Sequence, residues 1–123
     1  WYKDYDRVAA LNHARIEELI DIYDANVGRT KGGEAVITYF PDTGPWAFLN
    51  NFKFRGGTKG YERAELALAL ATALDVEIPV RMVVWSDAKA VAGKLDIADD
   101  YDLEGVSLFS INGKEDQDIY DEL

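Results

Sequence analysis

The sequence predicts an α+β fold in which five antiparallel strands close into a small barrel and one buried helix lies between the third and fourth strands. Two observations predict it. Five apolar runs are rich in β-branched and aromatic residues and are separated by turn residues, a pattern typical of strands. Residues 61–74 have helical spacing instead. The 123 residues are in the size range of a single domain, so we expect one core.

The first segments are the least determined by pattern. Residues 1–14 are interpreted as a short N-terminal helix or an arm. In residues 15–23 the apolar positions fit either an amphipathic helix or a strand with a bulge. We prefer the strand, because residues 24–33 hold three glycines and Asn26 and are typical of a turn-rich link to a following strand.

Residues 35–49 predict a hairpin. Residues 35–40 are β-branched and aromatic, and the following Pro-Asp-Thr-Gly-Pro at 41–45 indicates a turn. Residues 46–49 form a short apolar run that we expect to be the second strand. Residues 52–55 alternate between aromatic and basic side chains, and the glycine-rich residues 56–60 end that run.

The clearest element is the helix at residues 61–74. Leu66, Leu70 and Leu74 recur every four residues, and the alanines between them favour a helix. Glu62 and Glu65 lie near its N-terminus, where the helix dipole stabilises negative charge. Because few polar residues follow Glu65, we expect this helix to be buried on most sides.

Two further strands are predicted after this helix. Residues 80–85 are apolar at both parities, which predicts a central strand buried on both faces. Residues 106–111 predict the last strand. The connection between them, residues 86–105, holds an expected short helix at 88–95 and an acidic segment.

This order of elements has the connectivity of the OB-fold, a partly open five-stranded barrel that binds ligands on its second and third strands and on two neighbouring loops. The predicted organisation is a single domain over residues 1–123. It consists of an N-terminal arm at 1–14, an OB-like core at 15–111 and an acidic tail at 112–123.

Three stretches carry a resemblance to a known group of proteins: residues 46–49 (WAFL), the Lys-Gly-Tyr at 59–61 with the helix that follows, and residues 80–84 (VRMVV). Through them residues 15–111 resemble small secreted bacterial OB-fold proteins, which include the B subunits of pertussis-like and subtilase-type AB5 toxins. The resemblance implies a glycan-binding pentamer, usually with a disulfide. This chain contains no cysteine, and no sugar-contacting motif can be matched position by position.

Composition excludes several function classes. The net charge is −10, and residues 96–123 hold ten acidic side chains against a single basic one, Lys114. Such a field disfavours nucleic acid, whose binding depends on cationic side chains. No apolar run approaches the roughly 20 residues that span a bilayer. The acidic tail is interpreted as a solubilising terminus, and the alternative is a surface for a cation or a basic partner.

No catalytic apparatus, metal site or cofactor is predicted. His13 is the only histidine, cysteine is absent, and neither GxSxG nor HExxH occurs. The aspartates of residues 96–104 are a cluster of oxygen donors, but their spacing does not fit an EF-hand, so we interpret them as a solvated loop. The glycine-rich residues 56–60 are interpreted as a tight turn rather than an anion site. A carboxylate pair drawn from Glu62, Glu65, Asp87 or the aspartates near residue 100 leaves a hydrolase as a weaker alternative.

A ligand face follows from the barrel. The barrel would bring aromatic side chains on strands 2 and 3 together with polar side chains on two loops, a combination that suits sugars. The predicted ligand-binding residues are Asn26, Arg29, Lys31, Tyr39, Trp46, Ser86, Asp87 and Asp102. The alternative is that Tyr39 and Trp46 are core residues, since a register error of one residue inverts their orientation.

The sequence therefore predicts a non-catalytic binding domain that binds a glycan and self-associates. It begins at Trp1 rather than Met, which fits removal of a signal peptide and a secreted or periplasmic location, although a chain shortened for expression would begin in the same way. The alternative function is an acidic inhibitor or immunity-type protein that occupies a basic site on a protein partner.

Overall fold

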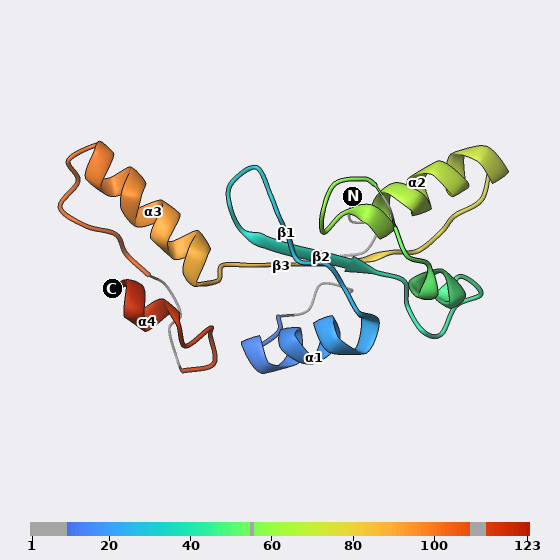
Figure 1. Cartoon of the computed structure of the whole chain (residues 1–123), viewed down its shortest axis with the longest axis horizontal. Coiled ribbons are helices and arrows are strands. Elements are labelled where there is room, and N and C mark those ends of the chain that lie inside the picture. The colour runs from blue at the N-terminus through green and yellow to red at the C-terminus, as the bar shows by residue number, and fades with distance from the viewer. Residues whose placement is uncertain (1–9, 55, 109–112) are drawn as a thin grey trace.

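The chain is an α+β protein with an open three-stranded antiparallel sheet, as the computed structural model in Figure 1 shows. The structure describes residues 10–54, 56–108 and 113–123. Its elements are, in chain order, α1 (His13–Tyr23), β1 (Gly28–Arg29), β2 (Ala35–Tyr39), the 3₁₀ helix η2 (Ala47–Asn51), α2 (Glu62–Leu74), β3 (Arg81–Trp85), α3 (Ala88–Asp100) and α4 (Ile119–Glu122). The predicted five-stranded barrel is therefore wrong, because only three strands form within the described residues and they do not close.

The middle strand β2 is the centre of the fold. It pairs antiparallel with β1, where Gly28 is opposite Val36, and with β3, where Ile37 is opposite Val83. Val36 and Ile37 are fully buried, and so is Phe40 just after the strand. Buried apolar side chains on both faces require a layer on each side of the sheet. Figure 1 shows α1 on one side and α2 on the other.

The segment predicted as a bulged strand at residues 15–23 is instead the helix α1, so the helical alternative is correct. The Asn12 side chain accepts a hydrogen bond from the Arg15 backbone N–H at 2.8 Å and so caps the helix. Ile16 and Leu19 are three residues apart and both buried, whereas Ile22 is 56% exposed. This spacing gives the helix one apolar face, which packs on Ile37 of the sheet.

The second half of the predicted hairpin is not a strand. Residues 46–49 lead into the 3₁₀ helix η2, and residues 52–54 have no regular structure. The Asn50 side chain explains why no strand pairs here: its Oδ1 accepts from the Phe40 N–H and its Nδ2 donates to the Phe40 carbonyl, both at 2.8 Å. One side chain thus forms the hydrogen bonds that the backbone N–H and carbonyl of Phe40 require. Leu49 adds its buried side chain to the core beside Phe40.

Helix α2 confirms the predicted helix, and two glycines determine where it begins. A Cβ atom on Gly28 would lie 1.6 Å from the Lys59 carbonyl oxygen, and one on Gly60 would lie 2.7 Å from the Gly28 nitrogen. The turn before α2 therefore packs directly on β1, as expected of a tight turn. The expected burial of α2 on most sides is wrong, because Leu68 is 70% exposed and only Arg63 and Ala67 are buried.

Strand β3 forms as predicted but lies at an edge of the sheet rather than in its centre. Only β2 pairs with it among the described residues. Met82 and Val84 are 40% and 49% exposed, so the face that was predicted to be buried is open. The last predicted strand is not found either: residues 106–108 have no regular structure, and residues 109–111 lie outside the described residues.

The C-terminal part packs as a helix pair at one end of the molecule (Figure 1). Helix α3 is longer than the short helix predicted at 88–95 and takes in part of the acidic segment. Its buried residues are Ala90, Val91 and Ala98, and Ile119 of α4 is also buried. The predicted arm at residues 1–9 lies outside the described residues. None of the helices described has the length and hydropathy that crossing a membrane requires.

Candidate functional site

The eight predicted ligand-binding residues do not form one face. Arg29 and Asp87 instead form an ion pair that joins β1 to the start of α3, with both guanidinium–carboxylate distances at 2.6 Å. Asp87 also caps α3 by accepting from the Ala90 N–H. Burial would raise the pKa of Asp87, but these hydrogen bonds outweigh it and hold the pKa below its ordinary value. This pair therefore has a structural role.

The two predicted aromatic platforms are packing residues, which was the alternative interpretation. Tyr39 stacks on Tyr23 of α1, with ring centroids 4.3 Å apart, and Trp46 packs in the core beside Leu49. Burial and a hydrogen bond from the Tyr23 hydroxyl to Asp42 raise the pKa of Tyr23 to about 12. Both rings are only partly exposed, and these packing contacts hold them.

The remaining predicted residues lie apart from one another. The Ser86 hydroxyl accepts a hydrogen bond from Lys94, and Lys31 is exposed in the turn between β1 and β2. Asp102 is exposed after the end of α3, with a φ of 51°. Ser86 lies at an open hollow beside the start of α1, and Asn26 lies in a smaller cleft with other polar side chains.

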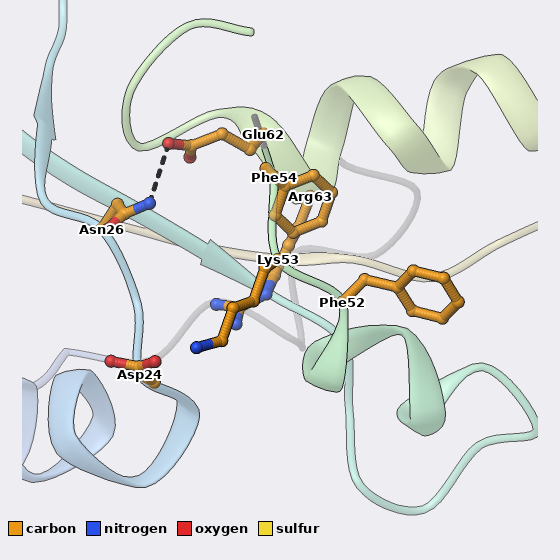
Figure 2. Close-up of a pocket in the computed structure, with 7 residues that line it drawn as sticks. All are labelled: Asp24, Asn26, Phe52, Lys53, Phe54, Glu62 and Arg63. Carbon is orange, nitrogen blue, oxygen red and sulfur yellow. Dashed lines mark hydrogen bonds between the residues drawn. The ribbon is translucent and has the colours of Figure 1, made fainter. Parts of the chain in front are cut away.

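That cleft has a volume of about 200 Å³ and lies between the end of α1, residues 52–54 and the start of α2 (Figure 2). Its polar lining combines Asn26 with two carboxylates and two cations, and Phe52 and Phe54 supply the apolar part. Asn26 donates to Glu62 Oε1 at 3.2 Å, and Glu62 Oε2 accepts from the Gly60 N–H at 2.8 Å. Glu62 is therefore engaged by the protein.

Arg63 is the buried cation of the cleft, and only 6% of its surface is exposed. Its guanidinium donates to three backbone carbonyls: Tyr23 at 2.6 Å, Asn50 at 2.9 Å and Thr38 at 3.3 Å. Its Nε is buried without a hydrogen-bond partner. Burial lowers the pKa of Arg63, although the charges of Asp24 and Glu62 act in the opposite direction.

Sequence reasoning missed Arg63. The available signal was an arginine one residue after Glu62, in a helix whose remaining residues are almost all apolar. A charged side chain on the buried face of a helix needs hydrogen-bonding partners, because burial removes its contact with water. Here the partners are carbonyls of three different segments, and a pattern along the chain does not show that these segments meet.

A second, more open hollow of about 500 Å³ lies beside the start of α1 and the end of β3. His13 Nε2 is 3.4 Å from Glu17 and 3.9 Å from Asp116, and the His13 backbone N–H donates to the Lys114 carbonyl. These contacts attach residues 113–118 to α1. No group of three or more acidic or histidine side chains in the described ranges is arranged to hold a metal ion.

The other notable surface is the exposed edge of the sheet, which we call the β3 edge (residues 81–85). No backbone hydrogen bond from a described residue other than those of β2 reaches it. Two apolar side chains of this strand are exposed, Met82 at 40% and Val84 at 49%.

Comparisons with protein-family models, with curated proteins and with solved structures find no match to this chain. None of them links it to the B subunits of AB5 toxins.

Proposed function

We propose that this chain is a non-catalytic binding domain that associates with a second copy of itself by pairing the two β3 edges. The observation that carries the proposal is the open, apolar edge strand. Proteins protect such edges with charges, proline, bulges or a covering segment. In β3 the only charge is on its first residue, Arg81, and the four residues after it are apolar.

The sequence of β3 is complementary to itself. In an antiparallel pair centred on Val83, Met82 of one copy is opposite Val84 of the other, so the two exposed apolar positions cover each other. Arg81 is then opposite Trp85 of the second copy, where a guanidinium can lie over an indole ring. The Arg81 side chain is exposed and forms no hydrogen bond or ion pair with any described residue, so it is available for this contact.

Pairing would also complete the sheet. Two copies related by a two-fold axis present the same edge to each other, which gives a closed dimer with one continuous six-stranded sheet. Stable interfaces bury about 800 Å² on each partner. Met82 and Val84 supply exposed apolar surface on the strand itself, so the dimer interface would be formed by this strand and the side chains beside it.

The test is the mass in solution, measured by sedimentation equilibrium over a wide concentration range. We expect the mass to rise from 13.8 kDa towards twice that value as the concentration increases. Val84→Lys puts two unpaired charges into the interface and should keep the chain monomeric. Leu68→Lys makes the same kind of change on the exposed side of α2 and should leave association intact. A wild-type chain that stays monomeric throughout, or a Val84→Lys variant that associates like the wild type, contradicts the proposal.

A second candidate function is binding to a basic protein, and the end of α3 favours it. Asp96, Asp99 and Asp100 are exposed in the last turns of that helix. Its final turn contains no basic residue. Negative charge at a helix C-terminus is unfavourable because it meets the negative end of the helix dipole. A basic partner would offset this repulsion, as expected of an acidic inhibitor.

This candidate is tested with poly-lysine as the probe, at low and high ionic strength. Changing these three aspartates to asparagine should weaken binding and reduce its salt dependence. The control changes three exposed acids of α1 to their amides, namely Glu17, Glu18 and Asp21. Equal losses in the two triple variants would mean that only net charge matters, and the candidate would fail.

A further inference from the structure

The cleft lined by Asp24, Lys53 and Arg63 holds charges of both signs that do not neutralise each other by direct contact. Asp24 and Lys53 are both exposed, and neither forms an ion pair within 4 Å with any described residue. Figure 2 shows Lys53 extending towards Asp24 across the mouth of the cleft. A free carboxylate and a free ammonium thus face one small space.

Arg63 adds a buried positive charge to this space. It has three carbonyl partners but no carboxylate within ion-pair distance among the described residues, and its Nε–H is unused. A buried cation without a counter-ion is costly, and an anionic group that enters the cleft would reduce that cost. The first turn of α2, where Arg63 lies, adds the positive end of the helix dipole.

A simple anion is nevertheless a poor match, because Asp24 and Glu62 line the same cleft. An anion would meet two repelling carboxylates and a cation would meet two repelling basic groups. A ligand with one charge of each sign has favourable contacts with both. Phe52, which is 56% exposed, and Phe54 offer an apolar wall beside these charges.

The size of the cleft limits the ligand further. Its volume of about 200 Å³ is below the roughly 300 Å³ at which sites for drug-sized ligands begin, so the ligand is small. An aromatic α-amino acid combines the required features in one molecule: a carboxylate, an ammonium next to it and a ring.

We propose that this cleft binds an α-amino acid with an aromatic or large apolar side chain. Its carboxylate lies towards Lys53 and the positive charge of Arg63, its ammonium lies towards Asp24, and its side chain packs on Phe52 and Phe54. None of these residues belongs to the β3 edge, so the site is independent of self-association.

Calorimetry with three probes tests the proposal: L-phenylalanine, 3-phenylpropanoate, which lacks the ammonium, and 2-phenylethylamine, which lacks the carboxylate. We expect L-phenylalanine to bind most tightly. Asp24→Asn should weaken the binding of L-phenylalanine about fivefold, which is the effect expected of one partly exposed ion pair. It should not weaken the binding of 3-phenylpropanoate. Lys53→Gln should weaken the binding of L-phenylalanine and of 3-phenylpropanoate, and should leave the affinity for 2-phenylethylamine unchanged.

These two variants are suited to the test because both residues are exposed, and asparagine accepts the left-handed backbone that Asp24 adopts at a φ of 46°. Lys31→Gln and Asp21→Asn are the matched controls outside the cleft and should change nothing. Arg63 is left out of the first round because its three carbonyl contacts hold the fold together. The proposal is overturned if L-phenylalanine binds no more tightly than the two fragments, or if Asp24→Asn and Lys53→Gln affect all three probes equally.

Discussion

Two arginines show two ways in which this small fold accommodates a positive charge. Arg29 is partly exposed and has a bidentate carboxylate partner, Asp87. Arg63 is buried and has only backbone carbonyls. The first arrangement is complete within the chain, because the guanidinium of Arg29 is neutralised by a carboxylate. The second leaves the positive charge of Arg63 beside a cleft without a direct carboxylate partner among the described residues, and for that reason the cleft is the better candidate for a ligand.

The Arg29–Asp87 pair gives a prediction at the scale of single residues. Asp87→Asn keeps a good helix cap but removes the charge, so we expect a loss of about 1.5–3 kcal/mol in the free energy of unfolding near neutral pH. Urea denaturation measures this loss. Asp21→Asn, at an exposed position on α1, is the control and should change stability by less than about 0.5 kcal/mol.

The pH dependence of that loss has a definite sign. The pKa of Asp87 is lower in the folded chain than in the unfolded chain. The Asp87 carboxylate therefore stabilises the folded chain fully when the pH is above the pKa of the unfolded chain. This stabilisation is lost as the pH falls through the pKa of the folded chain. The difference between wild type and Asp87→Asn should therefore shrink below about pH 4. A difference that is constant down to the acid transition would show that charge does not contribute.

At the scale of elements, local patterns predict structure where one period dominates. Strands β2 and β3 were predictable because they are short runs rich in β-branched and aromatic residues, and helix α2 was predictable because its leucines recur at helical spacing. Helix α1 was not, since Ile16, Leu19, Ile20 and Ile22 match both a helix and a bulged strand. The deciding contact is the cap from Asn12 to the Arg15 N–H. A single asparagine is as typical of a turn as of a helix cap, so Asn12 is too weak a signal to settle the choice from sequence.

Long-range partners explain the other errors. Residues 47–51 form a 3₁₀ helix because the Asn50 side chain takes the backbone groups of Phe40 that a second hairpin strand would need. The same limit applies to the site. Asp24, Lys53 and Arg63 come together only where the end of α1, residues 52–54 and the start of α2 meet, and Arg63 donates to the Tyr23 carbonyl at that point.

Helix α2 gives a prediction at this scale, because its leucines differ in burial. Leu70 packs against the core that contains Phe40, whereas Leu68 is 70% exposed. We expect Leu70→Ala to lower the free energy of unfolding by about 2–3 kcal/mol through lost packing. Leu68→Ala should change it by less than about 0.5 kcal/mol. Thermal melting of the two variants measures the contrast, and equal effects would mean that α2 does not pack as described.

At the scale of the whole molecule, the most informative error is the burial of β3. Apolar residues at both parities predict a strand covered on both faces, and in the single chain Met82 and Val84 are exposed. Conflicts between a local pattern and the observed environment are expected mainly at functional sites. A second copy on the β3 edge would reduce this conflict, since Met82 and Val84 would each gain an apolar neighbour across the new strand pair.

Association of this kind makes stability depend on protein concentration, because binding to the folded state alone shifts the folding equilibrium. The thermal midpoint of the wild type should rise with concentration, and each tenfold increase should stabilise the dimer by about 1.4 kcal/mol. Val84→Lys should melt at one temperature throughout, and Leu68→Lys should behave like the wild type. This measurement is separate from the mass because it reports whether the folded chain is the species that associates. A wild-type midpoint that does not move, in a sample whose mass doubles, would mean that the unfolded chain associates as strongly as the folded one, and pairing of folded β3 edges would then not explain the mass.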